Sequence, residues 1–288
     1  MTQDPFDTLC EEMFRKHLEV NPQDGTVFGL HEPYDHRLPN GGLKGVQDSL
    51  RLMEDWSRKA HEIADAADLS TEQKIGLRLL DLSIGLQKFA MEDYQFVRMW
   101  PDGLELAGNL LFMMFSRDYA PYEERIKAIT SRLKEVPRFL EEFRSRFDGV
   151  RMVKLWVEMS IETCEQLPGF LEFMIDSSKG KVSEEVMKSL TESAAAARTA
   201  AKAQLDWLKV NLENADGAFP MGNEKLSKLL ELRGIPYTPE ELLNLAEGYL
   251  SEFKEERRRV AARIAPGKTV EEAAKVVQMR SPGISRRH

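Results

Sequence analysis

Residues 218–253 constrain the fold more than any other stretch, because they mark where two helices end and begin. A first, short helix carries leucines at helical spacing and is closed by Gly234, since glycine readily adopts the left-handed conformation found just past helix ends. After a Gly-Ile-Pro break, Thr238 caps a second helix, with Pro239 at its first position and Glu241 completing a capping box. That helix carries one apolar stripe: Leu242, Leu245, Ala246, Tyr249, Leu250 and Phe253.

The rest of the chain is also predicted to be helical. Apolar residues recur at three- and four-residue spacing in residues 6–18, 43–66, 70–94, 104–115, 121–134, 137–147, 150–177, 183–214 and 270–279. No segment alternates β-branched and polar residues between turn signals, which leaves little or no sheet. We therefore predict an all-α fold, an elongated bundle of long antiparallel helices. Residues 1–279 are expected to form a single helical domain, followed by a disordered basic tail over residues 280–288.

Four local expectations follow from glycine, proline and polarity. Pro137 is predicted to separate two helices, and Pro168 to kink or split the helix over 150–177. Residues 104–115 are the most apolar stretch, so we expect a buried helix in which Asn109 needs an internal hydrogen-bond partner. Residues 22–42, punctuated by glycine and proline, are predicted to be one long loop.

Charge and composition exclude several classes of protein. The formal net charge of -8 argues against nucleic acid as the main partner. No run of about 18 apolar residues is present to span a membrane, and the acidic, polar N-terminus does not resemble a signal peptide. Cys10 and Cys164 are expected to be reduced core thiols of a soluble, cytoplasmic protein. An enzyme that uses either cysteine is a remote alternative, since neither has a supporting local motif.

The most tempting chemical motif is residues 31–36, His-Glu-Pro-Tyr-Asp-His. A zinc-binding HExxH helix needs its histidines four residues apart, so that both imidazoles leave one face. Here the histidines are five apart and Pro33 lies between them, so we reject a zinc-peptidase site. We expect Asp35, His36 and Arg37 to hold the loop through hydrogen bonds and ion pairs. A metal site of another kind that includes Asp35 is a weaker alternative.

Other candidate chemistry has structural explanations. Adjacent glutamates occur five times, but neighbouring residues on a helix do not face each other, and several lie in first turns where they favour the helix dipole. Residues 255–259, Glu-Glu-Arg-Arg-Arg, read as a solvated helical face. The sequence contains no glycine-rich phosphate loop, no serine nucleophile elbow and no CxxC.

Three stretches carry a family resemblance: residues 29–39, residues 132–140, and the helix, Gly-Ile-Pro break and Thr-Pro-Glu-Glu-Leu-Leu restart after residue 218. They resemble the DUF885 proteins, a helical family related to the HExxH zinc metallopeptidases, in the order that the family shows. The resemblance implies that residues 29–39 contribute to the wall of an active-site cleft, which makes His31, Asp35 and Arg37 candidate binding residues. No HExxH is present, so no catalytic residue and no metal ligand is assigned, and zinc is expected only with a C-terminal half.

The resemblance also implies that the polypeptide of family members continues beyond the region matched here into that C-terminal half. We therefore expect a truncated or frameshifted product or a split-gene subunit, with a genuinely short protein as the other reading. The preferred function is a non-catalytic N-terminal half that forms one wall of a substrate cleft, partnered by a complementary half or by self-association, with peptide as a candidate substrate. The alternative is a stand-alone helical scaffold that binds a peptide or a protein. An exposed apolar patch is expected where a partner packs.

Overall fold

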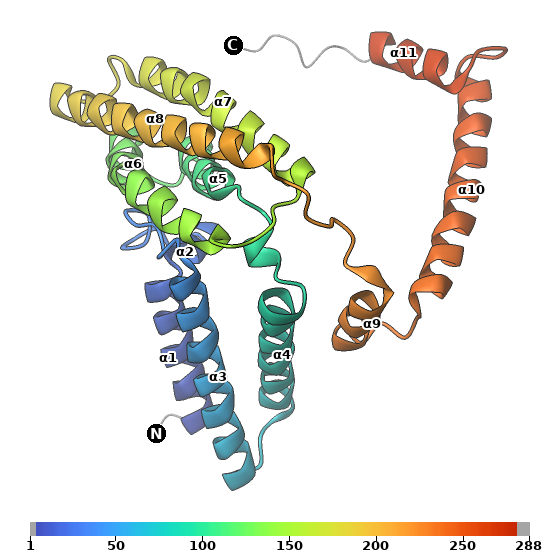
Figure 1. The fold of residues 1–288 in the computed structure, drawn as a ribbon, viewed down its shortest axis with the longest axis horizontal. Helices are drawn as coiled ribbons and strands as arrows, with labels where there is room; N and C mark the ends of the chain where they lie inside the picture. The colour runs from blue at the N-terminus through green and yellow to red at the C-terminus, as the bar shows by residue number, and fades with distance from the viewer. Residues whose placement is uncertain (1–3, 281–288) are drawn as a thin grey trace. The chain divides into compact units, whose positions relative to one another are not determined.

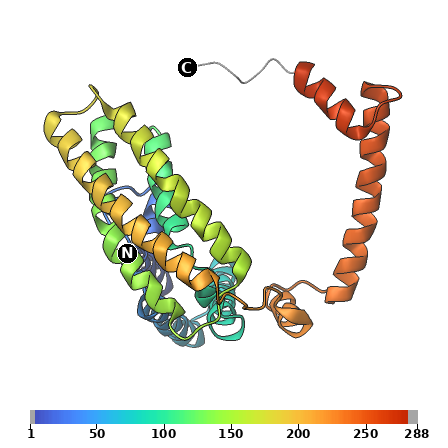
Figure 2. The same ribbon diagram turned by 45° about the horizontal axis from the view of Figure 1, so that its top comes forward.

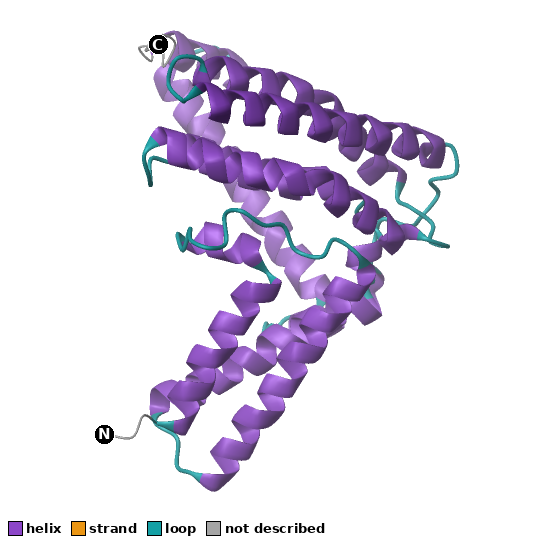
Figure 3. Ribbon diagram, turned by 90° about the vertical axis from the view of Figure 1, so that its left-hand side faces the viewer, coloured by secondary structure: helices purple, strands orange, loops and turns teal. Residues whose placement is uncertain are grey.

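The computed structural model describes residues 4–280, and Figure 3 shows the described chain as helices joined by loops, without a strand in that range. The prediction of an all-α fold is confirmed. The predicted basic tail over 280–288 lies almost entirely outside the described residues. None of the described helices is long and apolar enough to cross a membrane.

Contacts divide the chain into two compact units, with the boundary between Met221 and Gly222. This boundary falls at the Pro-Met-Gly turn of residues 220–222. A single helical domain over residues 1–279 stays a prediction. We describe each unit by itself.

The first part of unit 1 is a group of three long helices, α1 (Pro5–Val20), α3 (Leu43–Ala66) and α4 (Thr71–Lys88) (Figure 1). Their apolar faces meet in a small core that includes Phe6, Met53 and Trp56. Ser70 and Gln73 form a capping box at the start of α4. The chain then passes through a π-helical turn (Phe89–Asp93) and a 3-10 turn (Phe96–Arg98).

The second part of unit 1 holds the larger core. Here α5 (Gly103–Ser116), α6 (Tyr122–Arg144), α7 (Lys154–Ser178) and α8 (Glu184–Leu212) pack against each other, and α7 and α8 lie side by side in Figures 1 and 2. A short 3-10 turn, Ser145–Phe147, extends α6. Along α8, Ala194, Ala197 and Ala201 are fully buried. Their small side chains allow α8 to pack closely against its neighbouring helices.

Two proline-based predictions are wrong in detail. Residues Pro22–Phe28 form a short helix, α2, inside the predicted loop, with Pro22 at its start and Gly29 in the left-handed conformation at its end. The helix α6 runs through Pro137 without a break. A proline inside a helix removes one hydrogen bond, but Val136, Phe139 and Leu140 around it are fully buried, and this packing holds both segments on one axis. At Pro168, for which a kink or a split was predicted, α7 is one continuous helix, so it is not split there, and the kink stays a prediction.

Two predicted core positions prove to be on the surface. Asn109 is exposed on α5, so it needs no internal partner, and Phe112 on the same face is also exposed. Cys10 is exposed whereas Cys164 is buried as predicted, and both are free thiols. For both α5 and α1 the apolar periodicity predicts the helix correctly. One face of each helix, however, has no neighbour in unit 1 to cover it.

Unit 2 consists of α9 (Gly222–Leu232), α10 (Pro239–Ile264) and α11 (Val270–Arg280). The capping box of Thr238 and Glu241 forms as predicted, and Thr269 and Glu272 make the same pair of bonds before α11. A small alanine-rich core joins α10 to α11 around Ala261, Ala265 and Ala273.

Candidate functional site

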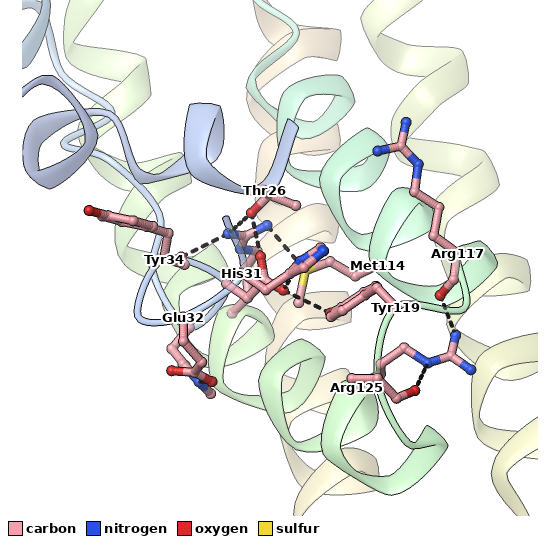
Figure 4. Close-up of polar contacts among 12 residues, drawn as sticks. Thr26, His31, Glu32, Tyr34, Met114, Arg117, Tyr119 and Arg125 are labelled. Atoms are coloured by element: carbon pink, nitrogen blue, oxygen red, sulfur yellow. Dashed lines mark hydrogen bonds and ion pairs between the residues drawn. The ribbon is translucent and has the colours of Figure 1, made fainter. Parts of the chain in front are cut away.

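The candidate site lies in residues 29–39, which we call the 29–39 loop. It begins where α2 ends at Gly29 (φ 79°) and contains a cis peptide bond between Glu32 and Pro33. Leu38 is buried in the larger core of unit 1, so the loop is anchored to that core. Figure 4 shows Thr26 of α2, His31 of the loop, Met114 of α5 and Tyr119 close together.

Asp35 is the centre of this arrangement and is almost fully buried. Its Oδ1 accepts a hydrogen bond from Thr26 Oγ1 at 2.6 Å. Its Oδ2 is 2.9 Å from His31 Nδ1 and accepts a second bond from the Tyr119 hydroxyl at 2.7 Å. Three donors from α2, from the loop and from the connection between α5 and α6 thus satisfy one carboxylate, as a buried charge requires.

Arg132 of α6 supplies the positive charge beneath the loop and is fully buried. Its Nη2 donates to Thr26 Oγ1 at 2.7 Å and to the Tyr34 carbonyl at 3.0 Å, and its Nε donates to the Arg37 carbonyl at 3.1 Å. Its Nη1 lies 3.1 Å from Met114 Sδ. The guanidinium therefore holds two loop carbonyls and reaches Asp35 through the Thr26 hydroxyl.

Burial sets the electrostatics of this cluster. Loss of hydration lowers the pKa of Arg132 to about 10, although the charge of Asp35 opposes the change. Burial and the bond to Asp35 raise the pKa of Tyr119 well above its usual range. Tyr119 therefore remains a protonated donor to Asp35 at neutral pH.

His31 is the group that this cluster presents outward. Its imidazole is stacked on Tyr119, with ring centres 3.4 Å apart and planes 7° from parallel. An ionised carboxylate accepts but does not donate, so Nδ1 must carry the proton that it shares with Asp35. Among residues 4–280 no partner contacts Nε2, and Nε2 is not among the buried unpaired atoms. Nε2 is therefore accessible and held in a fixed orientation, and in the neutral imidazole that carries its proton on Nδ1 it accepts a hydrogen bond.

The other predicted loop residues do not join this arrangement. Arg37 is exposed, and its Nη2 reaches the Glu19 carbonyl at 3.3 Å, away from Asp35. His36 pairs with Glu32 at 2.8 Å on the outer side of the loop. The structure thus brings His31 and Asp35 together and leaves the Arg37 side chain apart from them.

Sequence reasoning missed Tyr119, Arg132 and Thr26 as members of the cluster. Arg132 had a usable signal, because it occupies a position on the apolar face of α6, between Ile129 and Val136. A charged residue in such a stripe requires buried partners. Tyr119 lies in a short interhelical connection, where no periodicity identifies it.

A second buried carboxylate lies at the start of α5. Asp102 caps this helix through the Glu105 amide at 2.8 Å and accepts a bond from Thr163 Oγ1 at 2.7 Å. Burial raises the pKa of Asp102 to about 6. Burial, followed by the charge of Asp102, raises the pKa of the nearby Cys164 to about 12. Such a thiol stays protonated at neutral pH and is a poor nucleophile.

In residues 4–280, no group of three or more His, Cys, Asp and Glu side chains is arranged to hold a metal ion. The sequence itself contains no HExxH segment.

Comparison with known proteins gives a family and a fold. The sequence model of a family described as "Bacterial protein of unknown function (DUF885)" matches residues 22–285. No curated protein matches the chain. Among solved structures, one described as "a putative lipoprotein of unknown function" from Shewanella oneidensis is similar with a TM-score of 0.70 at 13% sequence identity. The match covers 96% of this chain and 52% of that one, so this chain spans about half the length of its structural neighbour. The predicted cytoplasmic location stays a prediction.

Proposed function

The chain belongs to the DUF885 family of bacterial proteins of unknown function, and we propose that it is the non-catalytic N-terminal helical half of a metallopeptidase-like fold. In this proposal the half forms one wall of a substrate cleft, and the 29–39 loop is part of that wall. The zinc site belongs to a second half, since the 288 residues here include no HExxH segment.

The observation that carries the proposal is the uneven coverage of the structural neighbour. Almost the whole of this chain, 96%, superposes on only 52% of the other chain. The rest of the neighbouring chain, which is about as long as the matched part, has no counterpart here. This supports the reading of this chain as one half of a two-part architecture. The metallopeptidase part of the proposal comes from the family resemblance of residues 29–39, 132–140 and the stretch after residue 218.

The geometry around Asp35 supports the role of the loop as a binding wall. Groups that bind a ligand work best when neighbouring contacts already hold them in the bound geometry. Asp35 and the stacked Tyr119 ring do this for His31, and Arg132 holds the loop backbone from below. An accessible Nε2 acceptor suits the N–H donors of an extended peptide, the substrate class that the proposal names.

A peptide titration observed by NMR tests the wall directly. A pool of random ten-residue peptides is added to the 288-residue chain while the imidazole signals of its histidines are followed. We expect the His31 signals to shift on addition, and His31→Gln to weaken peptide binding by about tenfold, the effect of losing one hydrogen bond to a fixed acceptor. His36→Gln is the matched control, since His36 lies in the same loop but faces Glu32. Equal effects of the two variants, or an unmoved His31, would contradict the proposal.

A specific observation favours the second candidate, a stand-alone peptide- or protein-binding scaffold. A groove of about 330 Å³ lies between α5 and α7, with Leu104, Phe112, Leu167 and Phe170 among its lining residues. Phe112 and the neighbouring Phe173 are largely exposed. If the peptides shift signals of Phe112 and Phe170 and leave His31 unmoved, the scaffold function replaces the cleft wall.

A further inference from the structure

A polar pocket of about 300 Å³ lies in unit 1, between α3 and the two turns that follow α4. This volume is at the lower end of the range that small-molecule sites in proteins show. Leu43, Leu50 and Met91 form the apolar part of the pocket. Leu50 belongs to the smaller core of α1, α3 and α4, and Met91 packs against that core. The pocket therefore rests on packed side chains.

The backbone beside the pocket departs twice from regular helix. In the π-helical turn Phe89–Asp93, the Tyr94 amide donates to the Phe89 carbonyl, five residues back, at 2.9 Å. Gln95, which lines the pocket, has a φ of 57°, and in residues 4–280 it is the only residue other than glycine with a positive φ. The rings of Phe89, Tyr94 and Phe96 stack in series and hold both turns in place. Such π-helical turns and strained residues cluster at functional sites.

Two arginines bring positive charge to this pocket. Arg98 is fixed by two carbonyls, because its Nε donates to Arg146 at 3.0 Å and its Nη2 donates to Asp148 at 2.9 Å. No carboxylate in the described part of the chain pairs with Arg98, and its Nη1 has no bond there. Arg51 of α3 comes no closer than 3.7 Å to Asp48. A guanidinium with free N–H groups is well suited to bind a carboxylate.

A carboxylate without a partner lines the same pocket. Glu92 is exposed, and within residues 4–280 no cation forms an ion pair with it. Glu54, which also lines the pocket, accepts a bond from Lys88 at 2.7 Å, so the Lys88 ammonium is already held. The pocket thus offers guanidinium groups and a free carboxylate above an apolar surface.

We propose that this pocket binds a small zwitterion, a free α-amino acid or a short peptide, with an aliphatic side chain. Arg51 and Arg98 bind its carboxylate, Glu92 binds its ammonium group, and Leu50 and Met91 contact its side chain. A ligand with both charges makes both polar contacts, whereas a ligand with one charge leaves the opposite group of the pocket without a partner. None of the lining residues belongs to the 29–39 loop, so the inference does not depend on the proposed function.

Methionine methyl signals test the pocket directly. L-Leucine and the dipeptide leucyl-leucine are each titrated into the 288-residue chain, whose 13 methionines carry labelled methyl groups, and Met91→Leu assigns the Met91 signal. We expect this signal to shift with a dissociation constant of about 1 mM or lower, and the tighter binder identifies the source of the zwitterion. A Met91 signal that neither probe moves at about 10 mM overturns the proposal.

Blocked ligands test the need for both charges. The N-acetyl form of the tighter-binding probe lacks the ammonium group, and its amide lacks the carboxylate. Each should bind the wild-type chain at least about tenfold more weakly, because each loses a charge-assisted contact. Blocked forms that bind as tightly as the parent probe would show that the pocket does not recognise a zwitterion.

Charge variants test which residues hold each end of the ligand. Glu92→Gln and Arg51→Gln should each weaken binding of the same probe at least about tenfold. Both side chains are exposed, so helical circular dichroism should not change. The N-acetyl form should lose nothing further in Glu92→Gln, because it has no ammonium group. Glu72→Gln and Arg78→Gln, at exposed positions of α4 outside the pocket, are the matched controls. Equal effects of the pocket and control variants contradict the assignment.

Discussion

The guanidinium of Arg132 donates a 2.7 Å hydrogen bond to the hydroxyl of Thr26, which lies 106 positions earlier in the chain. That hydroxyl donates its own proton to Asp35 at 2.6 Å. One threonine oxygen therefore links a buried cation to a buried carboxylate and joins α2, the 29–39 loop and α6 (Figure 4).

Removal of the cation is expected to be costly. Arg132→Ala leaves the Tyr34 and Arg37 carbonyls without their donor and Asp35 without a neighbouring positive charge. The expected loss in the free energy of unfolding is about 3–5 kcal/mol. Tryptophan fluorescence in urea measures it for unit 1 alone, since all four tryptophans precede residue 222. Lys134→Ala, on the exposed side of the same helix, should change stability by about 0.5 kcal/mol or less. A loss below about 1 kcal/mol for Arg132→Ala would contradict the linking role.

The hydroxyl of Tyr119 should contribute more than an ordinary tyrosine hydroxyl. Its bond goes to a charged acceptor, Asp35, whereas Tyr122 in the same region shares a bond with the neutral Ser178 hydroxyl at 3.0 Å. Tyr119→Phe is expected to cost about 1.5–3 kcal/mol and Tyr122→Phe about 1 kcal/mol. Urea unfolding of both variants makes the comparison. A larger loss for Tyr122→Phe would show that Asp35 is satisfied without Tyr119.

Asp102 makes the stability of unit 1 depend on pH. Burial raises its pKa from 3.8 in the unfolded chain to about 6 in the folded chain, so the folded state binds a proton more tightly. Its contribution to stability is therefore complete below about pH 4 and is lost as pH rises through about 6. The loss at neutral pH is about 2–3 kcal/mol, from about two pKa units.

Asp102→Asn removes this titration but keeps a side-chain oxygen to cap α5. Relative to wild type, the variant should gain about 2–3 kcal/mol between pH 4 and pH 7. Thermal unfolding of both proteins across this range measures the difference. Asp68→Asn, at an exposed carboxylate, serves as control and should show no such gain. A difference between Asp102→Asn and wild type that does not change with pH would contradict the account.

Most of the helical fold could be predicted because its signals are local. Thr238 and Ser70 mark helix starts through side-chain bonds that span three residues; both boxes form, the one at Thr238 as predicted. Pro137 misled the prediction, since its local preference against helix was outweighed by burial of Val136 and Phe139 on either side. Such burial depends on helices that are distant in sequence, which no local pattern contains.

The candidate site was predictable only in part, for the same reason. His31 and Asp35 are four residues apart in one loop, so their proximity follows from the sequence. Tyr119 and Arg132 reach Asp35 only through the packing of α5 and α6 on the loop. Arg37 was predicted with the site but its side chain lies elsewhere, because its backbone carbonyl is the part that Arg132 holds.

The proposed non-catalytic half is tested most directly by the zinc content and peptidase activity of the purified 288-residue chain. Elemental analysis after exposure to zinc and extensive dialysis gives the bound metal, and cleavage of the random ten-residue peptide pool gives the activity. The account predicts less than about 0.1 zinc per chain, because no HExxH segment is present to hold it, and no cleavage above buffer. One zinc per chain together with peptide cleavage that a chelator abolishes would contradict it.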